Sequence, residues 1–146
     1  MILDSGARRK FQSGAVRDIA DGKGRCDLLP LGIIGAALGI KPLIFIESYI
    51  RNGNTEDLWN AIKSFTGDDI VNICSALLEV SKQYEEGARK YSDRNWEKGI
   101  PVHCFIDSGV RHLLKYLRGD KDEPHDRAFI WNMLGAIWTH IHHPEL

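Results

Sequence analysis

The sequence predicts an all-α fold, a helical bundle whose core is formed by three long helices. Three observations indicate this. Apolar residues recur at helical spacing through the second half of the chain, glycines and prolines stand where those helices would end or begin, and no useful stretch alternates apolar with polar residues as a strand does. A chain of 146 residues suits a single domain, which we place at residues 1–146.

The N-terminal segment, residues 1–27, is polar and rich in glycine, so we expect an ordered loop or arm with a short turn. Shorter helices are then expected over residues 28–40, 42–52 and 55–65. Gly39, Gly53 and Gly67 stand where C-terminal caps of these helices would be, and Thr55 can cap the start of the third.

The stretch from Leu28 to Ile46 is almost wholly apolar and about as long as a membrane-spanning helix. Pro30, Lys41 and Pro42 interrupt it. We therefore expect two short helices that are buried in a core or in a subunit interface, and no membrane as a partner.

The three long helices are expected over residues 69–91, 101–118 and 124–142. Each has an apolar face at helical spacing, and Pro101 and Pro124 suit the first turn of the second and third. Because the loops between them are short, neighbouring helices should pack antiparallel. This part of the chain is where we expect the catalytic side chains.

Composition narrows the classes of function. The net charge of −1 gives no indication of a nucleic-acid partner. The three cysteines are far apart and form no CxxC pair, which argues against a disulfide framework or a zinc knuckle. The first residues turn basic and polar at once, unlike a signal peptide, so we expect a cytoplasmic protein.

Polar side chains form two stripes beside the apolar faces of the first two long helices. One contains Glu79, Glu86 and Lys90, and the other contains Asp107 and Arg111. If these helices pair antiparallel, Glu86 and Asp107 lie at nearly the same height and Glu79 lies near Arg111. Carboxylates on facing helices can hold Mg²⁺ or Mn²⁺, and the cations can neutralise a triphosphate.

Structural interpretations remain open for the same residues. Glu79 and Glu86 also suit a solvated helix face, and Asp107 also suits a salt bridge with Arg111. Asp126 stands in the first turn of the last helix, where carboxylates serve as caps, and His125 is either at the edge of the core or in contact with a base.

The loop from Gly22 to Arg25 is a weaker candidate. Its backbone amides and the side chains of Lys23 and Arg25 can bind phosphate, but the spacing is not that of a Walker A loop. A flexible glycine turn explains the same residues.

Motifs over most of the chain resemble the phage dATP/dGTP diphosphohydrolases, a MazG-like family. The resemblance rests on residues 17–30, 78–91 and 94–101, on the pair Arg111-His112, and on residues 123–126, together with His103 and Asp107. It implies hydrolysis of dGTP or dATP to the monophosphate and pyrophosphate, with two or more Mg²⁺ or Mn²⁺ ions per site, or Co²⁺, in a dimer or tetramer. The dGMP would supply 2-aminoadenine nucleotide synthesis while dATP is depleted.

From the stripes and the resemblance together we predict a catalytic, metal-binding set and a substrate-binding set. The first is Glu79, Glu86 and Asp107. The second is Lys23, Arg25, Lys90, Asn95, Arg111, His125 and Asp126. The chain departs from the usual MazG pattern of EExxE followed by ExxD, because Lys82 and Cys104 stand where carboxylates are expected. The preference for purines comes from the resemblance alone.

Two other functions compete. His125-Asp126 is an HD dipeptide, with His103 or His112 as a first metal ligand, which would suit an HD-type enzyme that releases triphosphate. No aspartate follows Asp126 to complete that pattern. The other alternative is a helical nucleotide-binding or interaction module without catalysis, which predicts no turnover of any dNTP.

Overall fold

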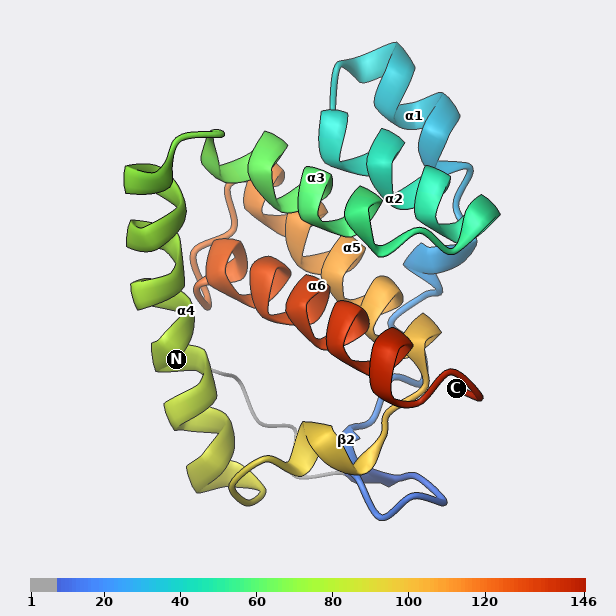
Figure 1. Ribbon diagram of the computed structural model, residues 1–146, viewed down its shortest axis with the longest axis vertical. Helices are drawn as coiled ribbons and strands as arrows, with labels where there is room; N and C mark the ends of the chain where they lie inside the picture. Colours follow the sequence, from blue (N-terminus) through green and yellow to red (C-terminus); the bar gives the residue numbers. More distant parts are fainter. Residues whose placement is uncertain (1–7) are drawn as a thin grey trace.

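The computed structural model describes residues 8–146, and over this range the fold is all-α apart from one small hairpin (Figure 1). This confirms the predicted class. The helices are α1 (Leu31–Leu38), α2 (Lys41–Asn52), α3 (Thr55–Thr66), α4 (Ile70–Lys90), α5 (Val102–Arg118) and α6 (His125–His142). Short 3₁₀ turns precede α1 and α5, at η1 (Cys26–Leu28) and η2 (Asn95–Lys98).

The helix ends follow local chemistry. Gly39, Gly53 and Gly119 end their helices with φ of 70°, 69° and 92°, a left-handed conformation that glycine adopts without strain. The cap of α3 is Asn54 and not Thr55 as expected, because the extended Asn54 places its side-chain oxygen 3.0 Å from the amide of Glu56.

The first apolar helix is shorter than the expected 28–40. Leu29 precedes a proline and has an extended backbone, with φ −65° and ψ 150°, so a helix does not run through it and α1 begins at Leu31. The break at Ile40 separates α1 from α2, which confirms two short helices. None of the helices that the structure describes is both long and apolar enough to cross a membrane.

Helices α5 and α6 form the centre of the core. Phe105, Val110 and Leu113 of α5 are buried, as are Phe129 and Met133 of α6. Two glycines let the backbones approach closely. A Cβ at Gly109 would lie 2.6 Å from Met133 Cε, and one at Gly135 would lie 2.4 Å from a ring carbon of Phe105. Helix α3 covers α6 from the side of α1 and α2 (Figure 1).

Helix α4 packs mainly on α6 and less on α3, so the expected antiparallel pair of α4 and α5 is not formed. Arg127 of α6 holds it: Nε donates to Gln83 Oε1 at 3.1 Å and Nη2 to Glu86 Oε1 at 2.7 Å. Only Val80 and Gln83 of α4 are buried. The three long helices are therefore not equal members of the core, because the turns of residues 91–101 carry α5 away from α4.

The segment predicted as an ordered arm contains a hairpin of β1 (Arg8–Lys10) and β2 (Val16–Asp18), antiparallel, with Arg9 opposite Arg17. Its later part packs η1 against α5. Residues 1–7 of this arm lie outside the described range.

Candidate functional site

A cavity of about 780 Å³ lies between the C-terminal half of α4, the middle of α5 and α6, β2 and the loop after α4. Its walls come from segments that are far apart in the chain. Helix α4 packs on α6 but not on α5, and this leaves the space between α4 and α5 open. Its volume is within the range of roughly 300–1,000 Å³ that is typical of small-molecule sites.

Positive charge dominates the cavity wall. Of the side chains in residues 8–146 that line it, six are cationic and three are carboxylates. The cations are Arg17, Lys23, Lys90, Arg94, Arg111 and Lys115, and the carboxylates are Asp18, Asp93 and Glu123. Such an excess in a concave, partly shielded site favours a multiply charged anion such as a polyphosphate.

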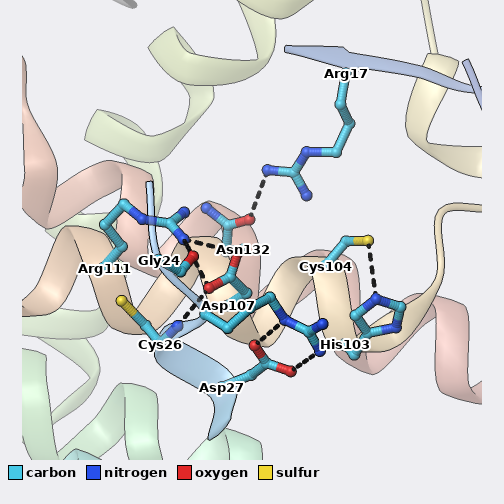
Figure 2. A network of polar contacts seen from close by, with 10 residues as sticks. Arg17, Gly24, Cys26, Asp27, His103, Cys104, Asp107, Arg111 and Asn132 are labelled. Atoms are coloured by element: carbon cyan, nitrogen blue, oxygen red, sulfur yellow. Dashed lines mark hydrogen bonds and ion pairs between the residues drawn. The ribbon is translucent and has the colours of Figure 1, made fainter. Parts of the chain in front are cut away.

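Arg111 is held in place from two sides (Figure 2). Its Nη2 lies 2.7 and 2.8 Å from the carboxylate oxygens of Asp107 and 2.7 Å from the carbonyl oxygen of Gly24. Asp107 Oδ1 also accepts the backbone N–H of Cys26 at 2.7 Å. Asp107 therefore fixes both an arginine of the cavity and the segment that carries Lys23.

Arg17 of β2 lines the cavity, and Figure 2 shows its side chain pointing toward Asn132. Its Nη2 donates to Asn132 Oδ1 at 3.1 Å, and the guanidinium lies 5.3 Å from the ring centre of Phe105 and 5.7 Å from that of Trp131. Burial lowers the pKa of Arg17 to about 10, which leaves it charged at neutral pH.

Two nitrogens of these arginines are shielded from solvent and unsatisfied. Arg17 Nη1 and Arg111 Nε have no hydrogen-bond partner among residues 8–146. A buried donor without a partner costs about 1–3 kcal/mol, more when it is charged. An anion in the cavity is the natural acceptor for both.

Aromatic side chains line the same cavity. The ring of Tyr84 lies 5.8 Å from those of both Trp96 and Trp131, and burial raises the pKa of Tyr84 to about 12, so its hydroxyl stays protonated. Tyr91 adds another ring. Flat aromatic faces beside cations suit a molecule with a stacking base and an anionic tail.

A cluster of histidines and carboxylates borders the cavity at the turn between α5 and α6. His112 Nδ1 lies 2.9 Å from His125 Nδ1, and His125 Nε2 donates to Asp122 Oδ1 at 2.7 Å. His112 and Glu123 line the cavity, while His125 is buried behind them. Burial, and after it the neighbouring His125, lowers the pKa of His112 to about 3, and burial raises the pKa of Glu123.

Four residues of the predicted substrate-binding set line the cavity: Lys23, Lys90, Asn95 and Arg111. The amide of Asn95 is engaged elsewhere, because it bonds the N–H and the carbonyl of Val16 at 2.9 and 2.7 Å. Asn95 thus fastens β2 to the cavity.

Three residues of that set are not among those that line the cavity. Arg25 makes a bidentate contact with Asp27 at 2.8 Å, and its side chain is half exposed. His125 is buried in the cluster described above, and Asp126 is exposed in the first turn of α6. Burial of one and exposure of the other reflect the rotation of 100° per residue along the helix.

The predicted catalytic carboxylates have separate partners. Glu79 is exposed and pairs with Lys82 at 3.0 Å, Glu86 pairs with Arg127, and Asp107 with Arg111. Within residues 8–146, none of the three belongs to a group of side chains whose oxygen or nitrogen atoms are close enough together to hold one metal ion. The expectation that they meet within one chain is therefore wrong, because it relied on α4 packing on α5. Their role as metal ligands stays a prediction.

Sequence reasoning missed several residues of the cavity. Arg17 stands in a polar segment without periodicity, and Trp131 and Tyr84 look like ordinary members of amphipathic helices. Lys115 follows the Arg111 stripe by one turn, at i+4, and that spacing was the one signal from which it could have been inferred.

A family model described as "dATP/dGTP diphosphohydrolase, N-terminal" matches residues 65–146, more than half of the chain. The chain belongs to this family. The matched segment contains α4, α5 and α6 and thus most of the cavity wall. No curated protein and no solved structure matches the chain.

Membership makes the chain an enzyme, a nucleoside triphosphate pyrophosphohydrolase of the dATP/dGTP diphosphohydrolase family. Membership argues against the HD-type alternative, and the geometry does so as well. His112 and His125 are in contact, but within residues 8–146 Asp126 belongs to neither of the two groups of side chains that are close enough together to hold a metal ion. The wider relationship to MazG-like enzymes stays a prediction.

Proposed function

We propose that this cavity binds dGTP and dATP and that the enzyme hydrolyses them to dGMP or dAMP and pyrophosphate. The observation that carries the proposal is the cavity itself, in which six cations and several aromatic rings face one space in a chain of the diphosphohydrolase family.

The cations divide the work of binding the triphosphate. Arg17 and Arg111 offer buried, unsatisfied donors from fixed positions, whereas Lys23, Lys90 and Lys115 supply charge on longer, more adaptable side chains. The purine stacks in the aromatic part of the cavity, near Trp131.

In the reaction, a water oxygen forms a bond to the α-phosphorus and gives up a proton. The bond from that phosphorus to the oxygen bridging to the β-phosphorus breaks, and pyrophosphate leaves with the electron pair. Charge develops on the phosphate oxygens during this step, so guanidinium groups held against them stabilise the transition state more than the bound substrate.

The proposal includes dependence on divalent metal ions, Mg²⁺, Mn²⁺ or Co²⁺. Such an ion, when bound, would neutralise phosphate charge and lower the pKa of the attacking water. Of the carboxylates predicted for this role, Asp107 and Glu86 are each engaged with an arginine, and Glu79 is solvent-exposed. The residues with ligand spacing are instead near His125.

A homo-oligomer, dimer or tetramer, is also proposed. Large apolar side chains are exposed on α4, including Val71 and Leu78 at 69% and 70%, and on α1, including Ile33 at 74%. Exposed apolar faces of this kind are typical of subunit interfaces. A second copy on α4 would cover the face that α5 leaves open.

In its biological setting, the proposed enzyme works in the host cytoplasm of a phage, as one domain spanning residues 1–146. It would supply dGMP for 2-aminoadenine nucleotide synthesis and deplete dATP. The support for this part is the resemblance of the sequence motifs, together with the family match.

The experiment is a panel of the four dNTPs with Mg²⁺, Mn²⁺ and Co²⁺, with the products separated by chromatography. We expect dGMP and dAMP with equimolar pyrophosphate. Release of triphosphate would support the HD-type alternative, and absence of turnover under every condition would support a non-catalytic module.

A further inference from the structure

We propose that His112, Glu123 and His125 bind a divalent transition-metal ion in the wall of the cavity. The inference deepens the proposed function, since it assigns the metal site of the dNTP cavity to residues other than the predicted carboxylates. It rests on that function only for the role of the ion, because binding of the ion is a separate property of the chain.

The ligand atoms of the three residues are already close together. One ring nitrogen from each histidine and one oxygen of Glu123 all lie within 4.8 Å of one another, and the two Nδ1 atoms are 2.9 Å apart. Two imidazoles on one tetrahedral ion, at about 2.0–2.1 Å each, hold their nitrogens roughly 3.3 Å apart. A small rotation of His112, with the carboxylate of Glu123 moving toward the two rings, would admit the ion.

Asp122 prepares His125 for this role. When His125 Nε2–H donates to Asp122 Oδ1, at 2.7 Å, the lone pair of a neutral ring is on Nδ1, which faces His112. A carboxylate behind the distal nitrogen is the usual support of a metal-binding histidine, because it fixes the tautomer and the orientation of the ring.

The fold holds the ligands rigidly. His112 belongs to α5 and His125 to the first turn of α6, the two helices that pack most closely, and Glu123 belongs to the turn that joins them. The same turn is secured by Arg118, whose Nε donates to Asp120 at 2.8 Å. The three ligands thus come from α5 and α6, the pair of helices with the most extensive mutual contact within residues 8–146, and from the turn that joins them.

The position of the site suits a catalytic ion more than a structural one. His112 and Glu123 line the cavity together with Arg111 and Lys115, so an ion between them would face the bound phosphates. Three protein ligands leave a coordination position open, which is the pattern of catalytic sites, whereas structural sites are closed by four.

The donor set selects the class of metal. Mg²⁺ prefers oxygen ligands and keeps several waters, whereas imidazole suits Zn²⁺ and other later transition-metal ions such as Co²⁺ better. Two histidines with one carboxylate therefore favour a transition metal over Mg²⁺. A second group, Asp120, Asp122 and His125, also has ligand spacing, but it does not line the cavity and Asp120 is bonded to Arg118.

The test is a titration of the metal-free full chain with Co²⁺, without nucleotide, followed by visible absorption and calorimetry. We expect saturable binding that His112→Gln weakens about 100-fold and Glu123→Gln at least about 10-fold. His103→Gln, on the exposed side of the same helix, and His142→Gln near the C-terminus control for adventitious histidine binding and should leave affinity unchanged. Circular dichroism verifies folding, and Glu123→Gln carries the test if His112→Gln fails to fold.

Binding that is equal in the wild type, His112→Gln and Glu123→Gln would overturn the proposal. Loss of binding in Asp120→Asn, with binding by Glu123→Gln unaffected, would also overturn it, because the ion would then be bound by Asp120, Asp122 and His125.

Turnover of dGTP is measured on the same samples. Turnover in the wild type with no site-specific Co²⁺ binding would overturn this inference and leave the proposed function intact. Specific binding without turnover would support the site and contradict the function.

Discussion

The two walls of the cavity differ in how they are held. Helices α5 and α6 bury most of their facing side chains against each other, and two glycines bring their backbones close together. Helix α4 buries only Val80 and Gln83, and much of its attachment is polar, through Arg127. A cavity with one fixed and one lightly held wall can keep its catalytic groups in place while the other wall adjusts to a ligand.

The largest effect is expected at the fixed wall, from Arg111→Ala. The change removes a phosphate-binding cation and leaves the buried Asp107 without its ion pair, so we expect kcat/KM for dGTP to fall about 100-fold or more. Stability should fall by about 3 kcal/mol in denaturant unfolding, as for other broken buried pairs.

Arg89→Ala is the matched control on the other wall. Arg89 pairs with Glu85 on the exposed face of α4, and such pairs contribute only about 0–1 kcal/mol. If Arg111→Ala and Arg89→Ala lost activity equally, the distinction between a fixed wall of α5 and α6 and a lightly held wall of α4 would be wrong.

A second comparison adds one methyl group to each wall. In Gly135→Ala the new Cβ would lie 2.4–2.9 Å from ring carbons of Phe105, and overpacking of this kind costs about 1–3 kcal/mol. In Gly87→Ala nothing lies within 4 Å, so the better helix propensity of alanine should stabilise the protein by about 0.5–1 kcal/mol. Thermal or urea unfolding measures both, and opposite signs are the expected result.

Arg127→Met tests what holds α4. The variant keeps much of the apolar volume but removes the donors to Gln83 and Glu86, leaving the buried Gln83 unsatisfied, at about 1–3 kcal/mol. Hydrogen exchange should become faster in α4 and stay unchanged in α5. Faster exchange spread evenly over α5 and α6 would show that the attachment of α4 is not local.

The smallest effect on the fold is expected from Leu78→Asp, because that side chain is 70% exposed on α4. We expect a change of less than about 0.5 kcal/mol for the monomer but a fall in oligomer mass by light scattering. Ile33→Asp on α1 is the counterpart. A mass reduced by Ile33→Asp and not by Leu78→Asp would place the interface on the short helices.

The sequence was sufficient to predict the helices, since their periodicity and end signals are local. Lys23, Lys90 and Arg111, which the sequence analysis assigned to substrate binding, line one cavity, and their role in binding stays a prediction. The packing of α4 could not be predicted, because an apolar stripe shows which face is buried but not which helix covers it. The error over Glu86 follows from this: its partner is Arg127, a residue of α6 that no stripe on α5 predicts.

The His112–His125 pair illustrates the same limit. The two residues are on different helices, and the sequence brought them together only in an incomplete HD pattern, although His125 was also predicted to bind substrate. Their contact depends on the tight turn of residues 119–124 and on the close packing of α5 and α6. Arg17 was missed for a different reason, because its place in the cavity depends on the hairpin and on the bonds between Asn95 and Val16.

The most direct test of the central claim, that purine dNTPs bind in this cavity, uses the protein's own tryptophans. Trp96 and Trp131 line the cavity, whereas Trp59 of α3 does not. The fluorescence of the protein is followed during titration with a dGTP analogue that has a methylene bridge between the α- and β-phosphorus atoms. We predict a saturable change that Trp131→Phe largely removes and Trp59→Phe retains; a change that survives Trp131→Phe and disappears with Trp59→Phe would place the nucleotide elsewhere and contradict the account.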